Sequence, residues 1–325
     1  MSRQAILLIN LGTPDAPNKP AVKRYLAEFL GDPRVVELPR ILWLPILHGI
    51  ILNTRPAKSA AKYATIWTPE GSPLKVHTER QAKLLRGLLG ERGRQDLVID
   101  WAMRYGNPAI PAVLDRLTAS GAEEILILPL YPQWAGSTTG STQDVVTSWL
   151  KRQKRPPVIR WIEDFHTDPG YIGALANAVR EHWQAHGRGE KLVMSFHGIP
   201  QRSVDRGDPY ARQCHATAHA LATALGLETG EWLATFQSRF GAAKWLQPYT
   251  QPTLEELARS GLKRVDVICP GFPADCLETL EEIAMECKEA FLHAGGQEFH
   301  YLPCLNERPD WIAALADLCQ PRLAD

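Results

Sequence analysis

The sequence lacks an excess of charge of either sign. Its 325 residues include 36 Lys and Arg against 36 Asp and Glu, so the formal net charge is zero. Proteins that bind nucleic acid usually carry a basic excess or a basic stripe. Neither is visible here, so we expect no nucleic acid partner.

Long apolar runs and a targeting leader are also missing. Residues 5–11 already have the pattern of a buried strand, so we expect no secretory or transit segment and a cytoplasmic protein. The apolar stretch at residues 41–52, ILWLPILHGIIL, is shorter than the about 20 residues that span a bilayer. Two interpretations stay open for it. One is a core helix, and the other is an apolar lip beside a pocket that allows peripheral membrane contact.

Cysteine pairs and phosphate-binding loops are absent as well. None of the six cysteines forms a CxxC pair, which argues against a zinc ribbon or a thioredoxin-like site. In a cytoplasmic protein we expect these residues to be reduced thiols. No GxGxxG or GxxxxGK[ST] loop follows a predicted strand, which argues against a nucleotide-binding enzyme.

Predicted strands and helices alternate along the chain, as in a parallel sheet covered by helices on both faces. In the first half we expect strands at 5–11, 97–103 and 123–130, and helices at 21–30, 77–89, 110–120 and 142–151. In the second half we expect strands at 191–196 and 231–236, a strand followed by a turn within 264–273, and helices at 208–225, 253–260 and from residue 275. The pattern predicts an α/β protein with two similar doubly wound, Rossmann-like lobes.

Landmarks repeated between the halves support a divergent duplication. The matched pairs are Gly12 with Gly198, Arg104-Tyr105-Gly106 with Arg239-Phe240-Gly241, and Pro129 with Pro270. Their offsets of 186, 135 and 141 residues indicate an insertion of about 45 residues in the first half, which should contain the apolar stretch.

These observations predict the domain boundaries. We expect a first lobe over residues 1–160 with an apolar lip insertion at about 33–75, and a second lobe over 161–308 that carries the metal site. We expect a linker near 152–170 and a last helix within 309–325 that packs back on the first lobe. Ligands of open parallel sheets bind at the carboxyl ends of the strands, so we expect an active-site cleft between the lobes.

His197 is the first candidate for chemistry, because it follows a predicted strand in the motif SFHGIP. A neutral imidazole at such an edge can bind a metal or accept a proton near neutral pH. A hydrogen-bonded structural histidine is the alternative.

Glu278 is the second candidate. Together with Asp275 it matches a capping box, which by itself indicates only the start of a helix. Glu278, Glu282, Glu286 and Glu289 then fall on one narrow arc of that helix. A solvated face is one interpretation. The other is an acidic ladder that carries a divalent metal or protons toward a pocket.

Further candidates lie at strand ends or carry flat rings. Arg104, Tyr105 and Arg239 could bind substrate carboxylates, or the arginines could form ion pairs between the lobes. Tryptophan side chains could offer flat surfaces to a flat ligand, although most tryptophans belong to a core. The ones considered are Trp43, Trp67, Trp134 and Trp245.

Taken together the motifs resemble those of ferrochelatases, most closely the short forms of Gram-negative bacteria. The resemblance covers nearly the whole chain in the same order. The matching segments are INLGTPDAP (9–17), GSPL (71–74), MRYGNP (103–108), LPLYPQW with STTGS (128–141), SFHGIPQRS (195–203), TFQSRFG with WLQPYT (235–250) and CPGFPADCLETLEEI (269–283).

The resemblance implies a lyase that inserts Fe²⁺ into protoporphyrin IX and releases two protons, the last step of haem biosynthesis. It implies that His197 and Glu278 form the catalytic pair that binds iron and handles protons, with Glu282 and Glu286 as the acidic ladder. Porphyrin-binding residues are expected at Leu11, Ser72, Arg104, Tyr105, Trp134 and Trp245.

Three positions refine this expectation. Cys276 stands where several relatives carry His, so that position has at most a supporting role. Gly136 stands where some relatives carry a cluster-ligating Cys, and no Cys-rich tail follows, so we expect no [2Fe–2S] cluster and no permanently bound cofactor. Leu11 stands where relatives acting on coproporphyrin carry Tyr, which favours protoporphyrin IX.

Two rival functions stay open. One is a chelatase that inserts cobalt or nickel into another tetrapyrrole, although such enzymes usually lack the GTPDAP and CLETLEEI motifs. The other is a two-lobed carrier of porphyrin or haem without turnover, which would not need Glu278 opposite His197.

Overall fold

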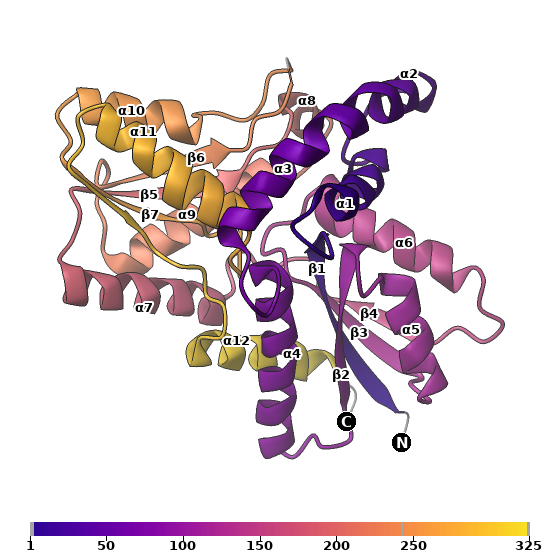
Figure 1. Cartoon of the computed structure of the whole chain (residues 1–325). Coiled ribbons are helices and arrows are strands. Elements are labelled where there is room, and N and C mark those ends of the chain that lie inside the picture. The colour runs from indigo at the N-terminus through magenta and orange to yellow at the C-terminus, as the bar shows by residue number, and fades with distance from the viewer. Residues whose placement is uncertain (1–2, 242, 324–325) are drawn as a thin grey trace. The chain divides into compact units, whose positions relative to one another are not determined.

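The structure is a computed structural model that describes residues 3–241 and 243–323, shown in Figure 1. The chain forms two compact units. The first lobe comprises the residues up to Tyr131, Ala135–Glu163 and the residues from Leu315 on. The second lobe comprises Pro132–Trp134 and Asp164–Ala314.

The sheet of the first lobe has the strand order β2-β1-β3-β4, with every pair parallel. Its strands are β1 (Gln4–Thr13), β2 (Val98–Gly106), β3 (Glu124–Pro129) and β4 (Val158–Trp161). β1 is buried on both faces, which explains its unbroken apolar sequence. One face packs against α5 (Ile110–Ala119) and α6 (Ser141–Leu150), with Trp149 in the core. The expected parallel α/β arrangement is confirmed.

Part of the predicted linker at 152–170 is a strand, because β4 lies within it and pairs with β3, and the boundary between the two units follows at Glu163. The basic residues and Pro156-Pro157 that suggested a linker lead directly into this strand. β4 is an edge strand, and Val158 is 59% exposed. Edge strands tolerate prolines and charges that a central strand would exclude, so the local composition concealed the strand.

The connection from β1 to β2 contains α1 (Lys19–Gly31) and α4 (Pro73–Glu91), which match the helices expected at 21–30 and 77–89. Between them, within the expected insertion, lie α2 (Arg40–Ile46), a π-helical turn η1 (Leu47–Ile51) and α3 (Leu52–Ile66). Asn18 caps α1 by accepting a hydrogen bond from the Ala21 N–H at 3.0 Å, a common use of Asn.

The apolar stretch 41–52 has two different faces. Trp43, Leu47 and Leu52 are buried with Leu30 in a small core, and Trp43 Nε1 donates to the Leu30 carbonyl at 2.7 Å. On the other face several large apolar side chains are exposed, with Ile41 83% exposed. The exposed set is Leu38, Ile41, Leu42, Ile46 and Ile50. The core interpretation therefore accounts for only half of this segment.

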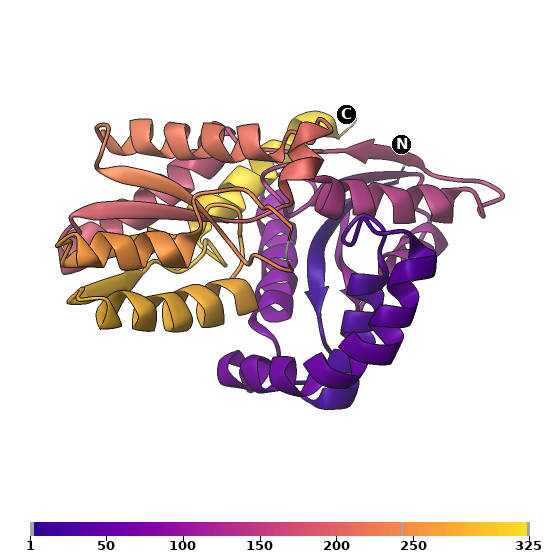
Figure 2. The same cartoon turned by 90° about the horizontal axis from the view of Figure 1, so that it is seen from above.

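The second lobe repeats the same strand order, β6-β5-β7-β8. Its strands are β5 (Lys191–His197), β6 (Trp232–Gln237), β7 (Arg264–Ile268) and β8 (Glu298–Tyr301). Figure 2 shows helices on both sides of this sheet. On one side lie α10 (Thr250–Arg259), the π-helix η3 (Glu278–Cys287) and α11 (Lys288–His293); on the other lie α7 (Pro169–His186) and α9 (Tyr210–Leu225). A short helix, α8 (Gln201–Asp205), precedes α9.

The register of the two sheets corrects the matching of the repeated landmarks. Asn10 pairs with Met103 in the first sheet, and Phe196 pairs with Phe236 in the second. With Gly12 matched to Gly198, Arg104 therefore corresponds to Gln237 and not to Arg239. By the same reasoning Pro129 corresponds to Cys269, not Pro270.

The last helix, α12 (Pro309–Cys319), crosses the boundary between the two units. Its Trp311 packs against Phe165 within the second lobe, with ring centroids 5.7 Å apart. Its Asp317 forms a 2.6 Å ion pair with Arg92 within the first lobe. In the part of the chain that the structure describes, no helix is long and apolar enough to cross a membrane.

Candidate active site

His197 is the last residue of β5 and its side chain is partly exposed. Its Nδ1 lies 2.7 Å from the Gly198 carbonyl oxygen. A carbonyl oxygen can only accept a hydrogen bond, so Nδ1 carries the proton in the neutral ring. Nε2 then keeps its lone pair, which is the form that binds a metal or accepts a proton.

Trp245 packs beside this histidine, and a glycine makes the approach possible. The ring centroids of Trp245 and His197 are 6.5 Å apart and the rings are tilted by 51°. A Cβ atom on Gly198 would lie 2.9 Å from the Gln237 carbonyl oxygen and 3.2 Å from the Trp245 ring. The glycine in the motif SFHG is therefore required for close packing between β5, β6 and the Trp245 ring.

Gln237, opposite His197 at the end of β6, links the strand ends to η3. Its Nε2 donates to the Glu278 carbonyl oxygen at 2.7 Å, and its Oε1 accepts from Ser195 Oγ at 2.7 Å. The next residue, Ser238, has a left-handed backbone with φ of 64°. This turn directs both its N–H and its hydroxyl to the Glu282 carboxylate, with the N–H at 2.7 Å.

Glu282 shares its surroundings with both predicted catalytic residues. Burial raises the pKa of Glu282 above its ordinary value, and the Glu278 carboxylate raises it further. The hydrogen bonds from Ser238 and the charge of His197 act in the opposite direction. His197, Glu278 and Glu282 therefore interact electrostatically as one group at the carboxyl ends of β5 and β6.

The capping box predicted between Asp275 and Glu278 is wrong. The Asp275 N–H is donated to Asn306 Oδ1 at 2.9 Å, not to Glu278. The Asp275 carboxylate accepts hydrogen bonds from Thr279, Tyr301 and Asn306, in a buried network that fixes the start of the helix. Glu278 is thereby not needed as a cap.

The Glu278 carboxylate lies instead beside Cys276. Burial raises the pKa of the Cys276 thiol, and the charge of Glu278 and a hydrogen bond to its side chain raise it further. Cys276 thus remains a protonated donor to Glu278.

The helix that follows is π-helical over Glu278–Cys287, a form frequent at functional sites. Its buried residues are Thr279, Glu281, Ile283 and Cys287. The wider turn changes which residues face the core. The predicted row of glutamates begins partly buried at Glu278 and Glu282 and ends exposed at Glu286 and Glu289.

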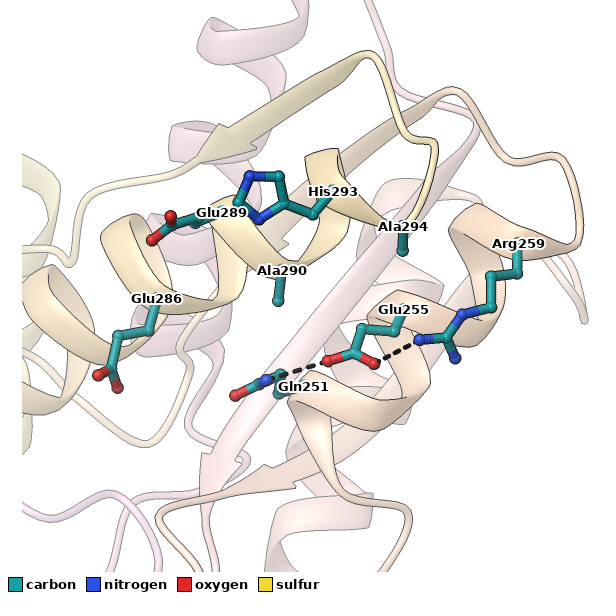
Figure 3. A pocket seen from close by; sticks show the side chains of 8 residues that line it. All are labelled: Gln251, Glu255, Arg259, Glu286, Glu289, Ala290, His293 and Ala294. Carbon is teal, nitrogen blue, oxygen red and sulfur yellow. Dashed lines mark hydrogen bonds and ion pairs between the residues drawn. The ribbon is translucent and has the colours of Figure 1, made fainter.

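The exposed end of the row lines an open hollow of about 630 Å³, shown in Figure 3. Glu286, Glu289 and His293 come from η3 and α11, and Glu255 comes from α10. Gln251 and Arg259 hydrogen-bond to Glu255 at 3.0 and 2.7 Å and lower its pKa. The glutamate row therefore leads from solvent toward His197, within one lobe.

Arg104 and Tyr105 lie in the first lobe, in a buried network around Asp32. Arg104 pairs with Asp32 and donates to Ser141 Oγ at 2.7 Å, while the Tyr105 hydroxyl donates to Asp32 at 2.8 Å. Burial acts to raise the pKa of Asp32, but hydrogen bonds from Ser141, Arg34 and Tyr105, with the charge of Arg104, lower it overall. Arg104 thus already has a carboxylate partner in its own lobe.

Tyr105→Phe is expected to lower the free energy of unfolding by about 1–3 kcal/mol, because Asp32 loses a buried donor. Tyr105 is only 1% exposed, so the KM for porphyrin should not change. Urea denaturation and steady-state kinetics on one preparation measure both quantities. Unchanged stability with a raised KM would show that Tyr105 contacts the substrate.

The other predicted site residues occupy varied positions. Ser72 is buried and accepts from Thr13 Oγ1 at 2.8 Å. Leu11 is partly exposed near the end of β1, where it holds the position that His197 holds in β5. Trp134 is partly exposed, and its N–H donates to Gln213 Oε1 at 2.6 Å. Trp67 is partly buried, whereas Trp43 belongs to the core described above.

The sequence reasoning missed Gln237, Ser238 and Asp32. Gln237 and Ser238 stood within a quoted motif, but only the fold shows that Gln237 pairs with His197 and that Ser238 binds the Glu282 carboxylate. Arg239, which was considered instead, is exposed and stacks over Tyr249 at 5.3 Å from the ring centroid.

Comparison of the fold with solved structures defines its class. SirB from Bacillus subtilis with Fe³⁺ matches with a TM-score of 0.56 and 14% identity, over 100% of this chain and 96% of that one. CbiX, the terminal enzyme of sirohaem biosynthesis in denitrifying bacteria, matches with a TM-score of 0.53 and 17% identity, over 98% and 99%. Two parallel α/β sheets of this kind thus form a chelatase-like fold.

Sequence comparison identifies the family. The model of the ferrochelatase family matches residues 3–323. Curated ferrochelatases of Aromatoleum aromaticum and Methylibium petroleiphilum are each 62% identical, covering 99% and 97% of this chain and 88% and 87% of their own lengths. The chain belongs to the ferrochelatase family. The predictions of family and of an iron-inserting lyase in haem biosynthesis are confirmed.

Proposed function

We propose that the chain inserts Fe²⁺ into protoporphyrin IX to form protohaem, with His197 and Glu278 as the central pair. In this reaction two pyrrole N–H protons leave as the metal forms four bonds to nitrogen. The enzyme must therefore supply a metal ligand and a proton acceptor close together. The observation that carries the proposal is His197 with a free Nε2 lone pair, grouped with Glu278 and Glu282 at the strand ends.

The glutamate row supports separate roles for its exposed and its partly buried members within the second lobe. Exposed Glu286 and Glu289 are suited to collect a hydrated divalent cation, since carboxylates attract such ions. Glu278 and Glu282 form the partly buried end of the row, and the Glu282 carboxylate interacts with the charge of His197. The raised pKa of Glu282 also lets it hold a proton at a pH where an exposed glutamate would be ionised.

Among the residues proposed to bind porphyrin, Trp245 has the strongest support. Its ring lies beside His197, and its Nε1 is buried without a hydrogen-bond partner among the described residues. Leu11, Ser72, Arg104 and Trp134 remain proposals from the family resemblance, whereas the burial of Tyr105 argues against direct contact of its side chain with porphyrin. We also retain the expectations of no permanent cofactor and no [2Fe–2S] cluster, which a measurement of acid-labile sulfide addresses.

Peripheral membrane contact through residues 41–52 is a further part of the proposal. Its support is the exposed apolar face formed by Ile41, Leu42, Ile46 and Ile50, since soluble proteins rarely expose adjacent large apolar side chains without a partner. A cytoplasmic location, with this face touching a membrane surface, remains our expectation.

Anaerobic incubation with Fe²⁺ and porphyrin tests the function. We expect loss of porphyrin fluorescence and growth of the haem band, with faster turnover of protoporphyrin IX than of coproporphyrin III because Leu11 leaves an apolar surface. Faster turnover of coproporphyrin III would overturn the substrate assignment. Tight porphyrin binding without turnover of Fe²⁺ or Zn²⁺ would favour the carrier, and a preference for cobalt or nickel with another tetrapyrrole would favour the other chelatase.

A further inference from the structure

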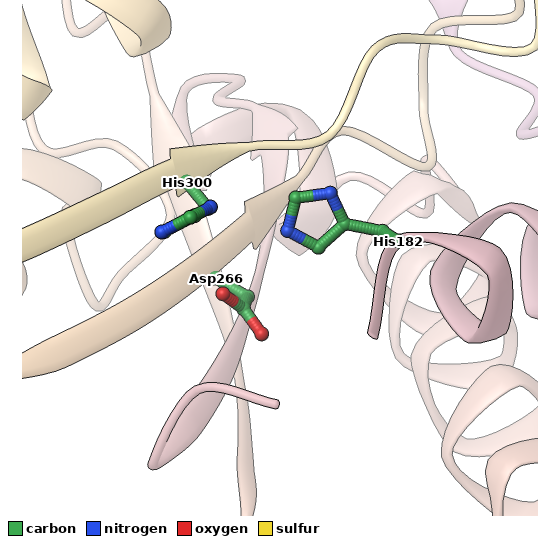
Figure 4. A group of neighbouring side chains, drawn as sticks. All are labelled: His182, Asp266 and His300. Carbon is green, nitrogen blue, oxygen red and sulfur yellow. The ribbon is translucent and has the colours of Figure 1, made fainter. Parts of the chain in front are cut away.

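A second group of potential metal ligands lies in the second lobe, away from His197. It consists of His182 on α7, Asp266 on β7 and His300 on β8, called here the His182 cluster and shown in Figure 4. One donor atom from each residue lies within 4.8 Å of the other two. Asp266 and His300 are ladder partners on adjacent strands, so the sheet itself sets their spacing.

Two atoms of this cluster are buried without a hydrogen-bond partner. Asp266 is 1% exposed, and its Oδ1 has no partner, nor has His182 Nε2. Buried polar atoms are nearly always satisfied, so two unsatisfied atoms facing one group of ligands require an explanation. A shared ion or a bound water would supply it.

The surroundings of Asp266 hold its carboxylate in place. Its Oδ2 accepts from Trp183 Nε1 and from the Gly189 N–H, both at 2.7 Å. A Cβ atom on Gly189 would lie 2.8 Å from that carboxylate, so only glycine lets the loop approach this closely. Hydrogen bonds of this kind fix the orientation of a ligating carboxylate in established metal sites. Here they hold Oδ2 and leave Oδ1 for a metal.

The histidines are also suited to ligation. His182 and His300 have ring centroids 5.2 Å apart at an angle of 72°, so the rings do not stack face to face. Burial lowers the pKa of His182, which favours the neutral, ligating form. Arg264 adds nearby positive charge, but Glu298 lies 3.3 Å from Arg264 Nη1 and 3.5 Å from His300 Nε2 and offsets it.

We propose that His182, Asp266 and His300 bind a divalent transition-metal ion of the Zn²⁺ type, with water as the fourth ligand. Two imidazoles and a carboxylate are a usual ligand set for zinc. Tetrahedral zinc with bonds of about 2.0–2.1 Å places its ligands about 3.3 Å apart, so modest side-chain rotations close the group around an ion. The ion would tie α7 to β7 and the edge strand β8.

This site is separate from the iron-inserting centre. Asp266 pairs with Leu192 in β5, five residues before His197. At about 3.3 Å per residue along a parallel strand, this corresponds to about 17 Å. A bound ion here would therefore stabilise the lobe without taking part in porphyrin metallation.

Zinc binding measured in a His197→Ala background tests the proposal, because that change removes the other histidine ligand. The metal-free protein is titrated with Zn²⁺ in competition with a chromogenic chelator, and melting is followed with and without Zn²⁺. We expect one tight equivalent and a raised melting temperature. Adding His300→Gln or Asp266→Asn should weaken this binding at least tenfold and abolish the shift, and the Asn can still accept from Trp183 and Gly189.

His186→Gln is the matched control, since His186 stacks on His182 at 4.6 Å but lies outside the cluster. It should leave zinc binding unchanged. His300→Gln in the otherwise unchanged chain should retain iron-inserting activity. Absence of zinc binding would refute the site. Zinc binding that survives His300→Gln with an unchanged stoichiometry and affinity would also refute it, because the ion would then be bound elsewhere.

Discussion

His197→Ala is expected to lower kcat for iron insertion by about a thousandfold, within the range usual for loss of a group that transfers protons. The substitution removes the Nε2 lone pair at the end of β5 while leaving the strand intact. The imidazole is partly exposed, and within residues 3–241 and 243–323 its Nδ1 bonds only to the adjacent Gly198 carbonyl, so stability should change little. Stopped-flow loss of porphyrin fluorescence under anaerobic conditions measures the rate.

His219→Ala is the control, because His219 is an exposed histidine on α9 of the same lobe. It should retain full activity. Porphyrin affinity, measured by fluorescence quenching without metal, should be retained in both variants. Partial rescue of His197→Ala by added imidazole would support a role for the lone pair itself. Activity within a few-fold of the unsubstituted enzyme would exclude His197 from the chemistry.

Glu278→Gln is expected to lower kcat by about a hundredfold, since it removes the carboxylate of the proposed central pair while preserving size. It should also shift the pH profile. The charge of Glu278 raises the pKa of Glu282, so its removal lowers that pKa. If Glu282 must be ionised to act, the acidic limb of the kcat profile should move to lower pH.

Glu256→Gln provides the matched control, because Glu256 is exposed on α10 and belongs neither to the row nor to the hollow. It should change neither the rate nor the pH profile. A reduced rate in Glu278→Gln with an unmoved acidic limb would mean that Glu282 does not govern that limb. An unchanged rate would remove Glu278 from the central pair.

The parallel α/β architecture could be predicted from the sequence, because β1 and β5 are buried on both faces and their apolar runs are unbroken. The edge strands β4 and β8 escaped prediction, since each has only four residues and an exposed side. Short edge strands gain their stability from a neighbouring strand, and a local sequence pattern does not reveal that partner.

The same limit applies to the site. His197 and Glu278 could be named from motifs, but the contacts that orient their neighbours depend on register. Asp275 illustrates this, since its spacing to Glu278 fits a cap, whereas Asn306, thirty-one residues away, takes the backbone bond. Likewise Arg104 resembled a free substrate ligand until the fold placed Asp32 against it.

The inserted helices of the first lobe have a consequence for how the chain folds. Asn10 must find Met103, 93 residues further along, whereas Phe196 finds Phe236 after only 40. The entropy of closing the longer loop costs about 0.7 kcal/mol more. Because non-local pairings slow folding, the central strands of the second lobe should pair before those of the first. The lobe that carries His197 and Glu278 is thus the one whose central strands are closer in sequence and are expected to pair first.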